Sequence, residues 1–99
     1  MELLHIFHLR TWHSPTAIPR ILLVLSRRRL RAEEVRVAVA DDPGFDDIEI
    51  RVRTGEAPAE RLRQQFARVV EVIAVRHTEG VPAERAPAPP LDVPFAAGD

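Results

Sequence analysis

Residues 14–39 read SPTAIPRILLVLSRRRLRAEEVRVAV, and this stretch decides the fold class. Its first part repeats apolar residues at the spacing of one α-helical face, and the predicted inner stripe consists of Ile18, Ile21, Leu22 and Leu25. Its last part alternates apolar and polar residues as a half-buried strand does, with Val35, Val37 and Val39 on the apolar side. A turn, an amphipathic helix and a strand in this order form half of a βαββαβ unit.

The remaining elements complete that unit. The first strand, at residues 4–9, is apolar on both faces, which predicts a central position in its sheet. After a polar turn, we expect a strand Asp47–Thr54, a helix with Pro58 at its first position that runs to about Val70, and a last strand Val72–His77. The order predicts an α+β, ferredoxin-like βαββαβ sandwich, with a four-stranded antiparallel sheet and two helices on one face.

Two residues compete to cap the first helix. If Ser14 is the cap, Pro19 falls where it removes an intrahelical hydrogen bond. If Thr16 is the cap, Pro19 is the third helical residue, whose amide has no helical partner in any case. We favour Thr16. The helix then runs to about Arg28, and a change of apolar parity predicts a bulge near residues 33–34.

Composition limits the functional classes. We expect one domain, residues 1–79, followed by a Pro/Ala-rich tail, residues 80–99, that is disordered or docked on a partner. The net charge is -1, from 14 basic and 15 acidic residues, so no overall field draws the chain to nucleic acid or to a membrane. The sequence has no cysteine and therefore no disulfide or thiolate metal site. Because the N-terminal segment resembles neither a signal peptide nor a membrane span, we expect a cytoplasmic protein.

Two segments carry a resemblance to a known family. Ser14-Pro15, Ile18, Arg20-Ile21-Leu22 and Val24 form the first segment, and Arg68-Val69-Val70-Glu71-Val72 with Val75 forms the second. The chain from about residue 4 to residue 79 resembles the ACT domain family, whose members are βαββαβ regulatory modules of amino-acid metabolism. The likeness is greatest to the small regulatory subunit of acetohydroxyacid synthase, also called acetolactate synthase, of the isozyme-II type.

The resemblance implies a non-catalytic regulatory or activating subunit that serves branched-chain amino acid biosynthesis. Such a subunit forms a homodimer through a sheet edge and helices, and it binds the catalytic large subunit. The resemblance also implies that the cofactors of that enzyme, namely thiamine diphosphate, FAD and magnesium, lie in the large subunit and not in this chain. The alternative is a free-standing ACT dimer that senses a small amino acid or another metabolite.

The loop before the first helix is the expected effector site. Ligand-binding ACT domains have an Asn and a Gly in this loop, and here His13 stands in place of the Asn and Thr16 in place of the Gly. The resemblance then implies a subunit that supports its partner without necessarily sensing an end product. The candidate effector-binding residues are His13, Ser14, Thr16, Ala17 and Ile18.

A partner surface is predicted on the first helix. Leu23 and Val24 lie off the inner stripe, and a small protein that exposes both is expected to cover them with a partner. Arg27 and Arg28 begin a basic cluster at the helix C-terminus, where arginine is also explained by the helix macrodipole alone. We take these four residues as the candidate partner interface.

No catalytic or metal-binding motif is found in the sequence. His5, His8, His13 and His77 share no metal-ligand spacing, and we interpret them as surface or edge histidines. RNA-recognition modules share the predicted topology but stack bases on aromatic residues of their central strands. The strand at 47–54 has no aromatic residue and Phe7 alone cannot form such a platform, so we expect no nucleic-acid binding.

Overall fold

The computed structural model describes residues 2–81, with the side chains of residues 79–81 left outside that description. The elements are β1 (Leu3–Trp12), α1 (Ala17–Arg27), β2 (Ala32–Val39), β3 (Phe45–Thr54), α2 (Glu56–Ala67) and β4 (Val72–Val81). The predicted βαββαβ order is therefore confirmed. The boundary expected at residue 79 falls inside β4, and the predicted tail from residue 82 onward lies outside the described residues.

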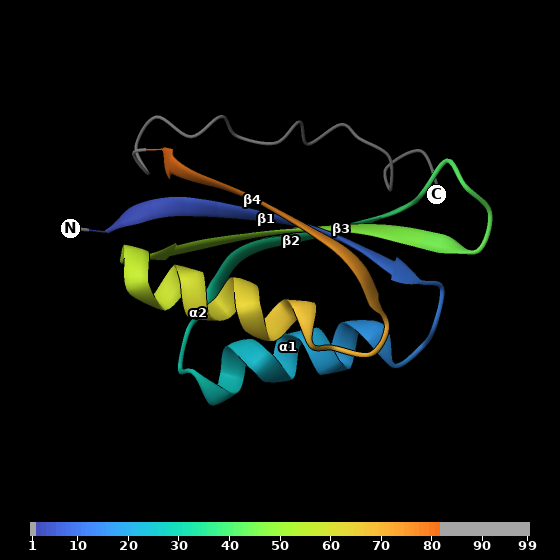
Figure 1. Cartoon of the computed structure of the whole chain (residues 1–99), viewed down its shortest axis with the longest axis horizontal. Helices are drawn as coiled ribbons and strands as arrows, with labels where there is room; N and C mark the ends of the chain where they lie inside the picture. Colours follow the sequence, from blue (N-terminus) through green and yellow to red (C-terminus); the bar gives the residue numbers. More distant parts are fainter. Residues whose placement is uncertain (1, 82–99) are drawn as a thin grey trace.

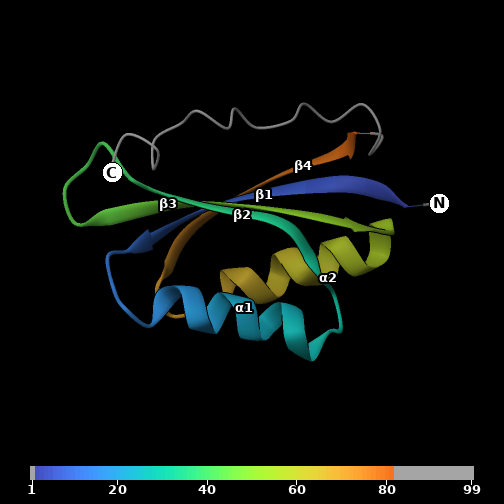
Figure 2. The same ribbon diagram turned by 180° about the vertical axis from the view of Figure 1, so that it is seen from behind.

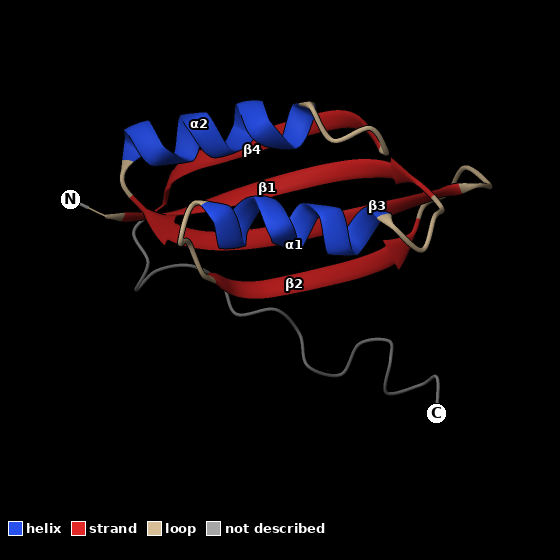
Figure 3. Ribbon diagram, turned by 90° about the horizontal axis from the view of Figure 1, so that it is seen from below, coloured by secondary structure: helices blue, strands red, loops and turns tan. Residues whose placement is uncertain are grey.

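The strands form one antiparallel sheet in the order β2-β3-β1-β4. Both helices cover the same face of this sheet, and no other helix or strand among residues 2–81 covers the opposite face, which we call the open face (Figure 1 and Figure 3). The reverse view in Figure 2 shows the same two layers from behind. The ferredoxin-like fold and the central position of β1 are confirmed, because β1 lies between β3 and β4.

The core lies between the sheet and the two helices. Its members are fully or almost fully buried, namely Phe7, Leu9, Ile21, Leu25, Ile48, Ile50, Val52, Ala59, Leu62 and Phe66. Phe7 on β1 and Phe66 on α2 meet edge to face, with ring centroids 5.3 Å apart. Apolar burial of this kind is the main stabilising term in a domain of this size. Because Phe7 is a core residue, it is not on the open face, where an RNA-recognition module would need it.

Each helix has a proline at its third position. α1 begins after Thr16 as predicted, so Pro19 lies where its missing N–H has no helical partner. α2 begins after Gly55, so Pro58 is its third residue. The prediction that Pro58 is the first residue of this helix is therefore wrong. Glu56 begins α2 because an acidic residue in the first turn complements the helix macrodipole. α2 also ends at Ala67, earlier than the predicted Val70.

The strand bounds differ from the predicted ones by a few residues. β3 begins at Phe45, two residues before the predicted start, because the hairpin turns tightly at Gly44 with φ +89°. β4 extends past His77 to Val81 and stays paired with β1. The predicted bulge is confirmed, since the register of β2 on β3 shifts between Ala32 and Glu34.

The burial of α1 corrects one position of the predicted stripe. Ile21 and Leu25 are buried and Ile18 is partly buried, but Leu22 is 41% exposed. Ile21 and Leu25 define the side of the helix that faces the sheet, and Leu22 projects sideways from it. Val24 projects to the opposite side and packs against the core, whereas Leu23 is exposed as predicted.

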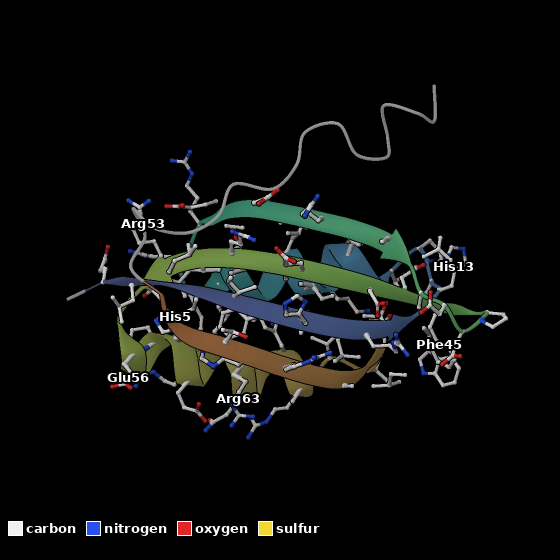
Figure 4. The ribbon with its side chains drawn as sticks, turned by 90° about the horizontal axis from the view of Figure 1, so that it is seen from above. His5, His13, Phe45, Arg53, Glu56 and Arg63 are labelled. Carbon is white, nitrogen blue, oxygen red and sulfur yellow. The ribbon has the colours of Figure 1, made fainter. Side chains whose placement is uncertain are left out.

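The open face of the sheet carries charged side chains that pair within one strand and between neighbouring strands. Arg51 on β3 bonds to Glu49, at 2.8 Å from Nε to Oε2, and lies near Glu34 of β2. Arg10 on β1 donates to both carboxylate oxygens of Asp47 on β3, at 2.9 and 3.2 Å. These hydrogen bonds hold the pKa of Asp47 below its ordinary value and raise that of Arg10. Figure 4 shows this face with its side chains.

Candidate functional site

The β1–α1 loop places the hydroxyls of Ser14 and Thr16 together. Ser14 Oγ lies 2.9 Å from Thr16 Oγ1 and 3.2 Å from the backbone amide of Thr16 that donates to it. The first helical amide, that of Ala17, donates to the carbonyl of Ser14, and the amide of Arg20 donates to the carbonyl of Thr16. The side chain of Thr16 makes no capping bond to its own helix, so it is free to bind elsewhere.

Thr16 bonds to Glu71, a residue 55 positions away in the turn just before β4. The hydroxyl of Thr16 donates to Oε2 of Glu71, and Nε of Arg20 lies 3.2 Å from the same oxygen. Glu71 is buried, and its other oxygen, Oε1, has no hydrogen-bond partner within the described part of the chain. The hydrogen bond from Thr16 lowers the pKa of Glu71, and the charge of Arg20 acts in the same direction. Glu71 is therefore an ionised, largely buried carboxylate at the N-terminal end of α1.

The side chain of His13 does not join this group. Its Nδ1 lies 2.9 Å from Oδ2 of Asp46 on β3, and its backbone amide donates to the carbonyl of Gly44 at 2.9 Å. Next to it, the rings of Trp12 and Phe45 lie 4.8 Å apart. Figure 4 shows His13 and Phe45 at this end of the sheet. The contacts of His13 thus attach the loop to the β2–β3 hairpin.

The five candidate effector residues therefore divide into three groups. Ser14 and Thr16 lie together, His13 turns to the hairpin, and Ala17 and Ile18 pack in or against the core. The sequence analysis predicted neither the bond from Thr16 to Glu71 nor the ion pair of Arg20 with the same carboxylate. A single acid between Val70 and Val72, at the junction of the second helix and the last strand, was the available signal for Glu71.

The predicted partner interface also divides. Val24, Arg27 and Arg28 line a groove of about 580 Å³ between α1 and α2, together with Leu30, Pro58, Arg61 and Gln65. Leu23 lies outside this groove. Among the described residues, none of the three groove arginines forms an ion pair. The groove therefore combines an apolar floor with three uncompensated positive charges, and we call it the arginine groove.

A second surface lies along the outer edge of β2. Among the described strands, β2 pairs only with β3, so no described strand bonds to the backbone groups of its other edge. Val35 and Val37 are 37% and 47% exposed although they stand opposite the buried residues Ile50 and Ile48 of β3. The exposed side chain of Leu22 projects from α1 on the side away from the arginine groove. We call Leu22, Val35 and Val37 the β2-edge strip.

The interpretation of His5 as a surface or edge histidine is wrong. His5 lies on the central strand β1 and is 1% exposed, and its Nδ1 lies 3.0 Å from Nε2 of His77 on β4. The ring of His77 stacks on Phe7 at 4.4 Å. Within the described part of the chain, the buried Nε2 of His5 has no partner, which favours the tautomer with the proton on Nδ1, because an unbonded buried acceptor is less unfavourable than an unbonded donor.

Metal and membrane sites were also sought in the structure. Within residues 2–81, no group of three or more His, Asp or Glu side chains lies close enough together to hold a metal ion. In the same range, no helix has the length and apolarity required to cross a membrane.

Comparison with solved structures identifies the fold. The sequence matches no protein-family model and no curated protein. The structure is similar to the acetolactate synthase small subunit from Thermotoga maritima, with a TM-score of 0.69 and 20% identity over 75% of this chain and 46% of that chain. It is also similar to the ACT domain of GTP pyrophosphokinase from Chlorobium tepidum, with a TM-score of 0.66 and 14% identity over 79% of this chain and 100% of that domain.

A third similar structure is a homoserine dehydrogenase from Thiobacillus denitrificans, with a TM-score of 0.67 and 14% identity over 80% of this chain and 17% of that chain. This chain thus spans less than half of the small subunit from Thermotoga and a small part of the dehydrogenase. At these identities the comparisons show the fold, which is that of ACT domains.

Proposed function

We propose that this chain is a non-catalytic, cytoplasmic small subunit that regulates or activates acetohydroxyacid synthase of the isozyme-II type. The observation that carries the proposal is the ACT-type fold, which a solved small subunit of acetolactate synthase shares over 75% of this chain. The cofactors of the synthase, thiamine diphosphate, FAD and magnesium, then belong to the catalytic large subunit. The contribution of this chain is binding and positioning.

The arginine groove supports a role in binding another protein. Arg27, Arg28 and Arg61 line it together with apolar residues such as Val24 and Pro58, and arginine is enriched at protein interfaces. We propose that an acidic segment of the large subunit docks here, because the groove offers positive charge without internal compensation. The open face of the sheet is a less suitable surface, since Arg10 and Arg51 there already bond to neighbouring acids.

The β2-edge strip supports the formation of a homodimer. Two copies that pair their β2 strands edge to edge would satisfy the free backbone groups of both edges. The same arrangement would cover Leu22, Val35 and Val37 in each copy. A homodimer built through this sheet edge and α1 is therefore part of the proposal.

Reconstitution tests the proposal directly. The purified chain is mixed with the catalytic large subunit of acetohydroxyacid synthase from the same organism, and the formation of acetolactate is measured with all cofactors present. We expect a saturable rise in activity and co-elution of the two proteins in size-exclusion chromatography. If the activity of the large subunit does not change at saturating amounts of this chain, the proposal fails.

A free-standing ACT dimer that senses a small amino acid is the second candidate function. The β2-edge strip favours it, because this surface would form a dimer without any catalytic subunit. Titration calorimetry of the dimer against branched-chain, aromatic and sulfur amino acids tests this candidate. Saturable heat with one of them supports sensing, whereas the absence of heat across the panel contradicts it.

A further inference from the structure

Glu71 connects both ends of the β1–α1 loop to the start of β4. Its carbonyl accepts from the amide of Trp12 at 2.9 Å, where the loop begins. Its carboxylate accepts from Thr16, where the loop ends and α1 begins, and Arg20 contacts the same oxygen at 3.2 Å. The side chain of Glu71 is 9% exposed, so this carboxylate has left most of its hydration shell.

The N-terminus of α1 explains why a buried carboxylate is tolerated there. A helix N-terminus carries partial positive charge and favours a nearby anion. α2 supplies this charge from its own first turn, at Glu56, whereas α1 has no acidic residue in its first turn. Glu71 thus provides from a distant part of the chain the negative charge that α1 lacks.

Oε1 of Glu71 distinguishes this arrangement from an ordinary ion pair. It is buried and has no hydrogen-bond partner in the described part of the chain, although Oε2 accepts a hydrogen bond from Thr16 and forms an ion pair with Arg20. Buried carboxylate oxygens are normally bonded. The position of this carboxylate is therefore set by its contacts at Oε2 and not by hydrogen bonding of both oxygens. The pocket therefore acts as an anion site, and Glu71 is the anion that fills it.

We propose that Thr16, Arg20 and the N-terminus of α1 form a binding site for a small carboxylate, and that Glu71 occupies it as an internal ligand. In the native protein the site is closed to external carboxylates, including those of free amino acids. Removal of the Glu71 side chain opens the site to acetate. This inference concerns the loop alone and does not depend on the identity of any catalytic partner.

Chemical rescue by acetate tests the inference on the full chain. Thermal unfolding is followed at pH 7 for the native protein and for Glu71→Ala, in sodium acetate and in sodium chloride of equal ionic strength. We expect Glu71→Ala to unfold at a lower temperature in chloride, and acetate to raise its midpoint saturably by about 5 °C. The native protein should show no difference between the two salts. Equal effects of acetate on both proteins would overturn the inference.

Three further variants make the result specific. Glu60→Ala removes an exposed carboxylate that pairs with Arg63, and it should show no rescue by acetate. Glu71→Gln keeps the site filled without charge and should be insensitive to acetate. The double variant Glu71→Ala with Arg20→Ala should lose the rescue, because the positive charge of the site is gone. A rescue that persists in the double variant contradicts the site.

The experiment remains decisive if Glu71→Ala does not fold in chloride. If Glu71→Ala is unfolded in chloride, the expected result is that acetate restores its circular dichroism spectrum. A Glu71→Ala protein that stays unfolded in acetate as in chloride overturns the inference. Activation of a synthase plays no part in these measurements, so their failure is distinguishable from failure of the proposed function.

Discussion

At the N-terminal end of α1, Thr16 and Arg20 meet the buried carboxylate of Glu71, whereas at the C-terminal end Arg27 and Arg28 face the arginine groove without an acidic partner among the described residues. One helix therefore has one end whose charge is balanced inside the monomer and another whose charge is not. The two ends also differ in burial, since Glu71 is buried whereas Arg27 and Arg28 are exposed.

If the proposed docking in the arginine groove is right, the N-terminal end of α1 serves stability and the C-terminal end serves binding. A buried, hydrogen-bonded charge contributes to a unique local structure, and disturbing it affects folding. Exposed arginines that lack partners contribute little to folding, and their removal should change association with another molecule. Substitutions at the two ends should therefore change different measured quantities.

The largest effect is expected from Arg28→Glu, at the C-cap of α1. If an acidic segment of the catalytic subunit binds in the arginine groove, this reversal places like charges together and should weaken the complex about a hundredfold. Arg68→Glu is a matched control, because Arg68 is the C-cap of α2 and lies outside the groove. Both variants should lose similar stability, about 0.3 to 1 kcal/mol, through the helix macrodipole.

The measurement is the concentration of each variant that gives half-maximal activation of the large subunit. Equal activation curves for Arg28→Glu and Arg68→Glu would show that the arginine groove is not the docking surface. The arginines at the C-terminal end of α1 would then have no role in binding the large subunit.

The second effect concerns the N-terminal end of α1, which we call the closed end because Glu71 balances its charge inside the monomer. Glu71→Gln removes the charge that faces Thr16, Arg20 and the N-terminus of α1, and we expect the midpoint of thermal unfolding to fall by about 5 °C. Glu60→Gln is the control, because Glu60 bonds to Arg63 on the surface of α2, where such pairs contribute little. Activation by Glu71→Gln should stay native at temperatures where it is folded. Equal melting of the two variants would place Glu71 among ordinary surface acids.

A third prediction gives the pH dependence of the closed end. The folded protein holds the pKa of Glu71 below its ordinary value of 4.5, so ionised Glu71 stabilises the fold above that pH. This contribution is lost as the pH falls through the lowered pKa, and the native protein should then approach Glu71→Gln in stability. Urea unfolding midpoints of both proteins between pH 7 and pH 3 give the test. A difference in midpoint that does not shrink in acid would contradict the assignment.

The sequence predicted the order of elements and the layers because both depend on local periodicity. Alternation in β3 and the spacing of Ile21 and Leu25 are visible in any single segment. The bounds were less accurate, since Pro58 is compatible with the first and the third helical position alike, and only the cap at Gly55 decides between them.

The candidate site was predicted in part, because its partners are distant in sequence. The Thr16 cap follows from local rules, but the bond from Thr16 to Glu71 joins residues 55 positions apart. The pairing of His5 with His77 spans 72 positions and was missed for the same reason. The exposure of Leu22 depends on how far α1 extends over the sheet toward β2. The spacing of apolar residues within α1 does not give that position.

The smallest effect is expected at Arg29, just beyond the C-terminal end of α1, which we call the open end because its arginines have no acidic partner among the described residues. Arg29 has φ +56°, a left-handed conformation in which a Cβ is unfavourable and glycine is the usual residue. The amides of Arg29 and Leu30 donate back to Ser26 and Leu25, each at 3.0 Å, so the conformation is required to end the helix. Arg29→Gly should therefore stabilise the fold by about 0.5 to 1 kcal/mol in urea unfolding.

Two controls separate strain from charge at this position. Arg29→Ala removes the charge and keeps the Cβ, so it should give no gain, and Arg31→Gly removes a charge where φ is not positive and should destabilise the fold. A gain in Arg29→Ala would assign the effect to charge repulsion among the arginines. If Arg29→Gly is more stable and also activates the large subunit less well, the arginine is kept at this strained position for binding, as expected for the open end of α1.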